Sequence, residues 1–189
     1  MAIKPILDYA HHEAELRQPS APVTAFNRRL KQLAEDLKET LLANPGVGLA
    51  APQIGVHQRV IAFRLGQRED DTSELSPPIV LVNPTIVLAE EPVRGYDGCL
   101  SIPKLYGYTN RPQHLEVHGQ DERGRPVQMT LNDLDARVVD HEVDHLDGKL
   151  FIDYIQDYDR DLFVIVEDKN GQSKLVPYNS FVSTFIKKS

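Results

Sequence analysis

The sharpest chemical signal in the sequence is the run His-Glu-Val-Asp-His at residues 141–145. Residues four apart lie on one face of an α-helix, so the imidazoles of His141 and His145 can reach the same metal ion. Glu142 lies beside the first imidazole, where its carboxylate can contact a water at the metal without being a ligand. The run therefore predicts a metal-binding helix. An exposed polar helix with incidental histidines is the alternative, and the amphipathic pattern around Leu146 disfavours it.

A catalytic metal site needs a third protein ligand, because a tetrahedral ion takes three ligands and keeps one open position. Carboxylates are numerous in this chain, whereas Cys99 is its single cysteine. Cys99 lies in the run Asp-Gly-Cys-Leu-Ser-Ile-Pro at 97–103, where a preceding glycine and a following proline favour a bent, rigid backbone. A thiolate suits Fe(II) or Zn(II), and the adjacent Leu100 N–H could donate to an oxyanion. A lone cysteine is by itself more often a small buried hydrophobe.

A third cluster of interest is the glycine-rich run at residues 46–55, GVGLAAPQIG. Small residues let a backbone approach a ligand closely, and the amide of Gln53 could donate a hydrogen bond to a developing negative charge. Taken alone, the run fits a simple turn after a helix equally well. It is not a phosphate-binding loop, because no Gly-Lys-Ser/Thr follows.

Two other histidines four residues apart, His114 and His118, are expected not to bind a metal together. They lie in an alternating stretch in which Leu115 and Val117 share the opposite face. On a strand, four residues span about 13 Å, which is too far for two ligands of one ion. We interpret both as ordinary strand residues.

Two helices are expected to frame the candidate residues. Apolar residues recur at spacings of three and four over 25–43, which predicts an amphipathic helix with Thr24 as its N-cap and a stop at 44–46. The same periodicity returns over 133–147, with Gly148 as the expected C-terminal cap.

Short β-rich runs separated by glycine and proline occupy most of the remaining chain. A turn is expected at 121–124, and a second hairpin is expected in the tail around Asn170-Gly171. A polar surface loop is expected at 67–78. The predicted class is α+β, with mostly antiparallel sheets around a central HExxH metal-binding helix, in a single domain over residues 1–189. The expected strands lie at 59–65, 78–88, 114–120, 126–131, 162–168 and 173–178.

Composition limits the kinds of partner that the chain can have. Its net charge is −7, so we expect neither strong nonspecific nucleic-acid binding nor binding to an anionic membrane. No apolar run approaches the roughly 18 residues of a membrane span, and residues 1–18 lack the apolar core of a secretory signal. One cysteine excludes an internal disulfide. A reducing, cytoplasmic location is therefore expected.

The three motifs together resemble those of the peptide deformylase family. The family shows GxGLAAPQ, EGCLS and QHExDHLxG, and this chain has GVGLAAPQ at 46–53, DGCLS at 97–101 and DHEVDHLDG at 140–148. Their order and spacing match, and the resemblance covers roughly residues 5–155.

The resemblance implies a hydrolase that removes the formyl group from the N-terminal formylmethionine of nascent polypeptides. It implies one divalent metal on Cys99, His141 and His145, natively Fe(II) and replaceable by Zn(II), Ni(II) or Co(II). It further implies that Glu142 is the general base and acid. The remaining implied roles fall to three positions: the amide of Gln53 and the N–H of Leu100 stabilise the oxyanion, and the backbone of Gly48 binds the substrate peptide. The implied partners are a formylmethionyl peptide and the ribosome.

Three carboxylates near these residues carry expectations of their own. Asp97 replaces the family's glutamate and Asp140 its glutamine. We expect Arg137, three residues before Asp140 on the same helix, to offset the added charge. Asp144 is expected to orient one of the histidines, or else to be an ordinary surface carboxylate.

Three further expectations concern the substrate pocket and the rival functions. An apolar pocket should take the methionine side chain, with Ile54 and Val138 as candidate lining residues. An HExxH endopeptidase is one rival, although such enzymes usually complete the site with Glu or His rather than cysteine. A deformylase-like binding protein with little activity is the other, and only Asp97 and Asp140 support it.

Overall fold

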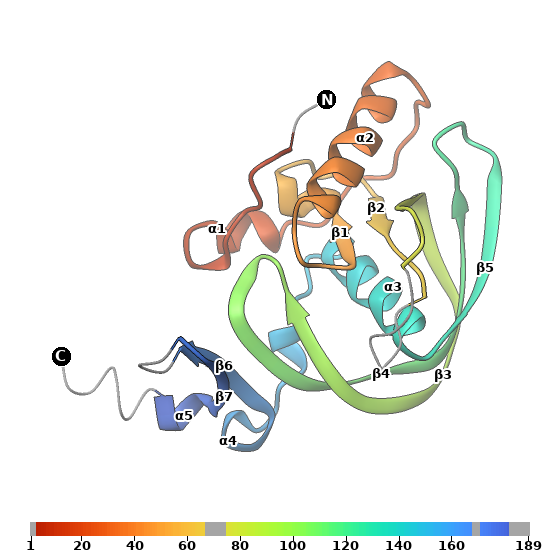
Figure 1. Cartoon of the computed structure of the whole chain (residues 1–189). Helices are drawn as coiled ribbons and strands as arrows, with labels where there is room; N and C mark the ends of the chain where they lie inside the picture. Colours follow the sequence, from red (N-terminus) through yellow and green to blue (C-terminus); the bar gives the residue numbers. More distant parts are fainter. Residues whose placement is uncertain (1–2, 67–74, 168–170, 182–189) are drawn as a thin grey trace.

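The fold is a layered arrangement of helices and one antiparallel sheet (Figure 1). The computed structural model describes residues 3–66, 75–167 and 171–181. The α-helices are α1 (Tyr9–Leu16), α2 (Arg28–Leu42), α3 (Asp133–Leu146), α4 (Tyr158–Asp161) and α5 (Tyr178–Phe181), and the 3-10 helices are η1 (Ala51–Ile54) and η2 (Phe151–Tyr154). The strands are β1 (Gly48–Ala50), β2 (Val60–Phe63), β3 (Ile79–Cys99), β4 (Ile102–Gln120), β5 (Pro126–Asn132), β6 (Leu162–Glu167) and β7 (Ser173–Pro177).

All pairings between these strands are antiparallel, in the order β1-β2-β3-β4-β6-β7 with β5 also paired to β4. The predicted α+β class with a mostly antiparallel sheet is thus confirmed. Among the helices that the structure describes, none has both the length and the apolar character needed to cross a membrane.

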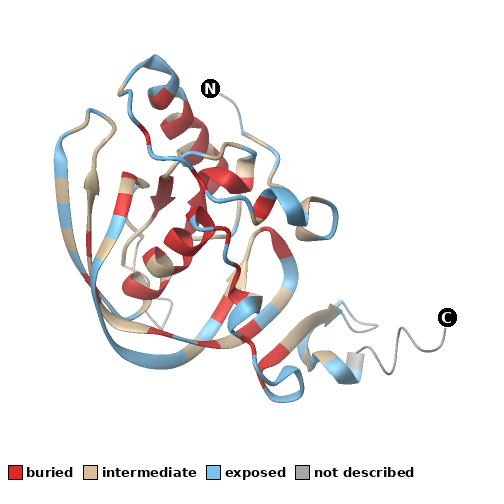
Figure 2. Ribbon diagram, turned by 180° about the vertical axis from the view of Figure 1, so that it is seen from behind, coloured by how far each residue is buried: buried red, intermediate tan, exposed pale blue. Residues whose placement is uncertain are grey.

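The core has three parts: two lie on opposite faces of the short strands β1 and β2, and the third lies around η2 and the start of β4. Successive side chains of a strand point to opposite faces, so Val60 and Ala62 pack toward α2 while Ile61 and Phe63 pack toward α3. Figure 1 shows α3 in the middle of the molecule, with the β3–β4 hairpin curving around it, and Figure 2 shows how much of α3 is buried. The helix that carries the HExxH run is therefore held on several sides.

Helix α2 begins three residues later than the sequence suggested. Its N-cap is Asn27, whose side-chain oxygen accepts hydrogen bonds from the N–H groups of Arg29 and Leu30. The expectation of Thr24 as N-cap was wrong, because residues 22–26 form no helix and the preceding Val23 is hydrogen-bonded to Asn83 instead. An asparagine satisfies the free N–H groups of a first turn as well as threonine does.

Helix α3 ends one residue before the predicted boundary, with Asp147 at the C-cap position and Gly148 directly after it. Its last residue is Leu146, and Gly148 follows with a φ of 71°, a conformation that favours glycine. The carbonyl oxygen of Arg17 lies so close that a Cβ atom at residue 148 would be 2.2 Å from it. The end of α3 is thus fixed against the segment that follows α1.

The β3–β4 hairpin ends at the cysteine. Cys99 pairs with Ile102 across the hairpin, and Leu100 and Ser101 form the tip. The bend that the glycine and proline around Cys99 suggested is therefore a hairpin tip. The hairpin tip thus places Cys99 next to α3, although the two are far apart in the sequence.

The tail forms strands, as the alternating pattern predicted. β6 pairs with β7 and also with β4, for example through Tyr106 and Phe163. Asn170, the expected first turn residue, and most of the expected loop at 67–78 (residues 67–74) lie outside the described residues. The predicted turn at 121–124 is confirmed between β4 and β5.

We predict that Gly148→Ala destabilises the protein more than Gly55→Ala. Both glycines have a positive φ, 71° and 76°, which costs an alanine about 1–2 kcal/mol. A Cβ at Gly55 meets nothing within 4 Å, whereas one at Gly148 collides with the Arg17 carbonyl. Urea unfolding should therefore show an extra loss of about 1–3 kcal/mol for Gly148→Ala. Equal losses in the two variants would contradict the packing described for the end of α3.

Candidate metal centre

The hairpin tip and α3 bring Cys99, His141 and His145 together. One ligand atom from each lies within 4.8 Å of the other two. The Sγ of Cys99 is 3.3 Å from Nε2 of His145. The two imidazoles stand edge to face, with ring centroids 4.9 Å apart. Cys99 and His145 are thus 46 positions apart in the sequence but in contact in space.

Asp97 fixes the orientation of His141. Its Oδ1 is 2.8 Å from Nδ1 of His141, so this nitrogen donates to the carboxylate and Nε2 is the nitrogen left for a metal. Burial alone would lower the pKa of His141, but the Asp97 carboxylate holds it well above its usual value. Burial lowers the pKa of His145 well below its ordinary value, which keeps that imidazole neutral and able to ligate.

The expectation that Asp144 orients a histidine was wrong. Its Oδ1 accepts from the hydroxyl of Tyr154 at 2.9 Å, and its Oδ2 accepts from Arg111 at 2.8 Å. One residue along a helix turns the side chain by about 100°, so Asp144 points away from the ring of the adjacent His145. The carboxylate that contacts a histidine comes from β3.

Arg111 of β4 joins the three carboxylates into one buried network. Its guanidinium donates to Asp97 at 2.6 Å, to Asp140 at 2.6 Å and to Asp144 at 2.8 Å, and only 2% of its side chain is exposed. Burial works against ionisation of Asp97, but His141 and Arg111 hold the pKa of that carboxyl well below its usual value. For the less tightly surrounded Asp140, burial prevails and raises the pKa.

The expectation that Arg137 pairs with Asp140 was therefore wrong. Asp140 forms its ion pair with Arg111 instead. Arg137 instead donates to the carbonyl of Val93 at 2.7 Å and to the hydroxyl of Thr109 at 3.0 Å. The strand arginine reaches Asp140 because β4 runs alongside α3, which spacing along the helix could not indicate.

Glu142 lies in the wall of the same site. It is buried, its Oε2 accepts no hydrogen bond from the described residues, and burial raises its pKa to about 7. A Cβ atom at Gly48 would lie 2.2 Å from Oε1 of Glu142. A side chain at residue 48 would therefore displace the Glu142 carboxylate from its present position.

Gln53 is held with its amide nitrogen toward the cysteine. Its Oε1 accepts from the N–H of Ala50 at 2.8 Å, which fixes the amide's orientation. Its Nε2 then donates to Ser101 Oγ at 3.1 Å and lies 3.4 Å from Cys99 Sγ. The short helix η1 thus presents a donor to the site, as the glycine-rich run suggested.

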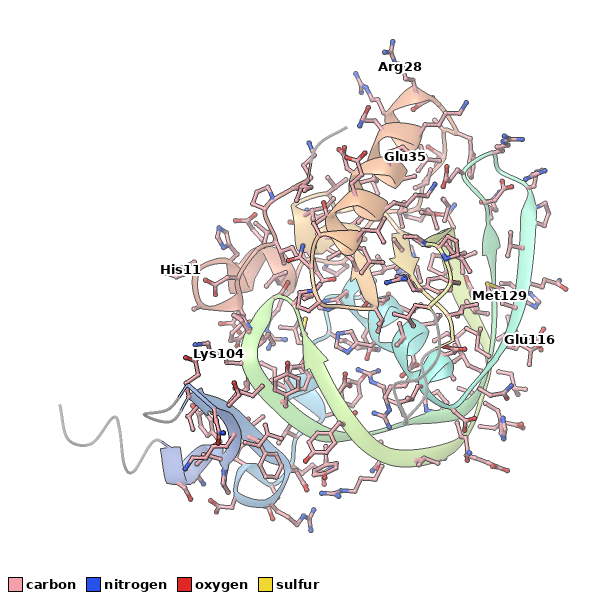
Figure 3. The ribbon with its side chains drawn as sticks, in the orientation of Figure 1. His11, Arg28, Glu35, Lys104, Glu116 and Met129 are labelled. Atoms are coloured by element: carbon pink, nitrogen blue, oxygen red, sulfur yellow. The ribbon has the colours of Figure 1, made fainter. Side chains whose placement is uncertain are left out.

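A cavity of about 440 Å³ opens beside these residues. Val138 lines it, as expected, but Ile54 does not and packs instead against the core near α2. In Figure 3, Lys104, which lines the cavity, lies just past the hairpin tip. The cavity is lined by residues 45–48, Gln53, 96–100, Pro103, Lys104, Tyr106, Leu134, Arg137, Val138, His141 and Glu142.

Three other histidines lie away from this cavity. His114 and His118 lie on β4 with partners of their own, Asn132 and Glu116. In Figure 3, His11 lies on the outer side of α1.

The donor set fits one divalent metal ion. A thiolate and two imidazoles suit Zn(II) or Fe(II), and three protein ligands leave an open position for catalysis. The adjacent Glu142 carboxylate is buried with one oxygen unsatisfied, as expected of a group that acts on a water at such an ion. Among the described residues, Cys99, His141 and His145 form the group of potential ligands that lie close enough together to hold a metal ion.

Comparison with known proteins identifies the family. The model of the family described as "Polypeptide deformylase" matches residues 3–161. This chain belongs to the polypeptide deformylase family. The peptide deformylase of Cellvibrio japonicus is 38% identical over 161 residues, covering 85% of this chain and 90% of the relative.

Solved structures agree with this deformylase in fold. The crystal structure of a peptide deformylase from Legionella pneumophila has a TM-score of 0.72 and 37% identity, covering 82% of this chain and 87% of that one. A Met-Ala-Ser-bound deformylase from Acinetobacter baumannii has a TM-score of 0.73 and 34% identity, covering 81% and 99%. The family match ends at residue 161, so the β6–β7 hairpin of this deformylase lies beyond it.

Sequence reasoning missed two residues of the site, Arg111 and Tyr154. Both contact Asp144, yet they lie on β4 and η2. Nothing in the pattern around Arg111 separates it from an exposed strand arginine. The one usable signal was the carboxylate that Asp140 adds beside that of Asp97, because two carboxylates close to the candidate metal ligands call for a buried cation.

We predict that Glu142→Gln stabilises the metal-free protein at alkaline pH and not at acidic pH. A carboxyl whose folded pKa is about 7 binds its proton more tightly than in the unfolded chain, so the folded state loses stability as pH rises from about 4.5 to 7. Glutamine does not titrate and escapes this loss, which amounts to about 3 kcal/mol.

Urea unfolding of metal-stripped wild type and variant at about pH 4 and pH 8 measures the difference directly. The variant's advantage should appear only at the higher pH. An advantage that is the same at both values would show that Glu142 is not a buried carboxyl of raised pKa.

Proposed function

We propose that this deformylase hydrolyses the N-formyl group of formylmethionyl peptides at the centre formed by Cys99, His141, His145 and Glu142. The observation that carries the proposal is the buried Glu142 carboxylate, unsatisfied at Oε2 and adjacent in sequence to one member of a Cys-His-His cluster. The alternatives are weaker. A cysteine in the cluster disfavours an HExxH endopeptidase, and the pairing of Asp140 with Arg111 removes the main reason to expect an inactive binding protein.

Cys99, His141 and His145 would hold one metal ion, and Fe(II) is the expected native ion, with Zn(II), Ni(II) or Co(II) as replacements. Such an ion supplies Lewis-acid activation of water and of the formyl carbonyl. Asp97 supports the ligand set by keeping the Nδ1 proton of His141 in place. Its contact with Arg111 keeps that carboxylate ionised.

Glu142 is proposed as the general base and acid. Its carboxylate takes a proton from the attacking water as the oxygen bonds to the formyl carbon. The same group then gives the proton to the peptide nitrogen as the C–N bond breaks, releasing formate and a free amine. A pKa raised to about 7 by burial suits both steps, because a group that titrates near the working pH exchanges protons readily in either direction.

Gln53 and Leu100 are proposed to stabilise the negative charge that develops on the formyl oxygen. The Gln53 amide is fixed with its nitrogen toward the cysteine, and Leu100 follows the cysteine at the hairpin tip. Donors that are already oriented need little rearrangement during the reaction, which is the main advantage of such sites. Gly46 lets its segment pack against the Leu100 side chain.

Gly48 is proposed to bind the substrate backbone. It lies on β1, which stands at one end of the strand order, so a peptide in extended form could pair with it. The peptide deformylase from Acinetobacter baumannii that was solved with Met-Ala-Ser bound supports a short peptide as the ligand. A nascent formylated chain emerging at the ribosome, in the cytoplasm, is the expected substrate.

The test is formate release from formyl-Met-Ala-Ser by protein loaded anaerobically with Fe(II). We predict turnover by the wild type, and a loss of at least about 100-fold in kcat/KM with the metal retained for Glu142→Ala. Cys99→Ala should lose stoichiometric metal. Asp147→Asn, a surface change near the end of the same helix, is the control and should behave as wild type. A Cys99→Ala protein with full metal and activity, or near-normal turnover by Glu142→Ala, would refute the assigned roles.

A further inference from the structure

The cavity beside the candidate metal centre, which was expected to be apolar, contains an arginine. Leu134, Arg137, Val138 and His141 all line it. These positions follow the helical spacing of three and four, so they lie along one face of α3. The cavity thus extends from His141 along α3, with Leu134 and Val138 supplying apolar wall and Arg137 supplying a cation.

Residues of β3 and β4 next to the cavity hold the guanidinium of this arginine. A Cβ atom at Gly95 of β3 would lie 2.7 Å from Nη2 of Arg137, so a side chain at residue 95 would displace the guanidinium from its present position. The guanidinium then donates to four neutral oxygens: the carbonyl of Val93 at 2.7 Å, the hydroxyl of Thr109 at 3.0 Å, the carbonyl of Gly95 at 3.4 Å and the carbonyl of Thr109 at 3.5 Å. Its position is therefore fixed.

The charge of Arg137 is not neutralised by direct contact. Arg111 lies against three carboxylates, but no ion pair within 4.0 Å involves Arg137 in the part of the chain that the structure describes. Asp97 and Asp140 act on it only from a greater distance. A buried cation held by neutral groups keeps a positive potential around it. An oxygen atom at that end of the cavity would be attracted to it.

We propose that Arg137 makes this cavity select substrates whose first side chain ends in an oxygen acceptor. The inference rests on the proposed function, in which the cavity receives the side chain of the formylated residue. The favoured class is a side chain of about methionine's length with an amide, carboxylate or sulfoxide oxygen near its end. Methionine sulfoxide, the oxidised form of methionine, belongs to this class.

The decisive comparison uses two side chains of similar length, glutamine and norleucine. The first ends in an amide and the second in a methyl group. The Fe(II) enzyme is assayed with formyl-Gln-Ala-Ser, formyl-Nle-Ala-Ser and formyl-Met-Ala-Ser, and kcat/KM is measured for each. We expect the ratio of glutamine to norleucine to exceed one in the wild type. A ratio below one overturns the proposal.

A variant tests whether Arg137 causes the preference. Arg137→Leu should lower the glutamine-to-norleucine ratio by about 10-fold or more, the scale of a lost hydrogen bond to a charged group. Val138→Ala, which changes the same wall without removing charge, should leave the ratio within about 3-fold. A ratio that Arg137→Leu leaves unchanged overturns the proposal.

Two outcomes separate this inference from the function on which it rests. If Arg137→Leu does not fold, the wild-type ratio alone decides the question. If the wild type fails to turn over formyl-Met-Ala-Ser, the proposed function itself has failed. Turnover of formyl-Met-Ala-Ser together with a preference for norleucine over glutamine refutes only the role of Arg137.

Discussion

The contact between Asp97 and His141 connects the parts of this molecule on which the site depends. One residue belongs to β3 and the other to α3, and Arg111 of β4 bonds to the same carboxylate. A buried carboxylate is costly unless it is paired and hydrogen-bonded. The sheet and the helix can therefore pack together only in an arrangement that satisfies all three groups. That arrangement also places Cys99, two residues after Asp97, against the histidines.

The same burial that makes this contact necessary gives Glu142 its chemical character. Arg111 compensates Asp97, Asp140 and Asp144, whereas Glu142 faces the glycine of β1 with one oxygen unsatisfied. The carboxylates on one face of α3 are thus paired with Arg111, whereas Glu142 on another face remains able to exchange a proton. Loss of stability at Glu142 and readiness for catalysis have one physical cause, which is the removal of water from a carboxylate without replacing its hydrogen bonds.

Much of the fold could be predicted, because it depends on local patterns. The 3.6-residue period identified α2 and α3, and alternation identified the tail hairpin. The ligand cluster was also accessible, since the spacing of His141 and His145 and the uniqueness of Cys99 are visible in the sequence. What remained out of reach was the pairing of charges across elements. Asp140 was assigned to Arg137 by helical spacing, but the register of β4 against α3 decided in favour of Arg111.

The central claim is that Asp97 holds His141 ready for the metal, and Zn(II) affinity tests it most directly. Competition with a chromophoric chelator should show that Asp97→Asn weakens binding by about 10- to 100-fold, the usual effect of removing a carboxylate behind a metal-binding histidine. Asp97→Glu, which restores the carboxylate found in the family motif, should remain much closer to wild type. Asp161→Asn, a change at another buried aspartate away from the centre, is the control. If Asp97→Asn binds Zn(II) as tightly as the wild type, the contact on which this account rests does not support the metal site.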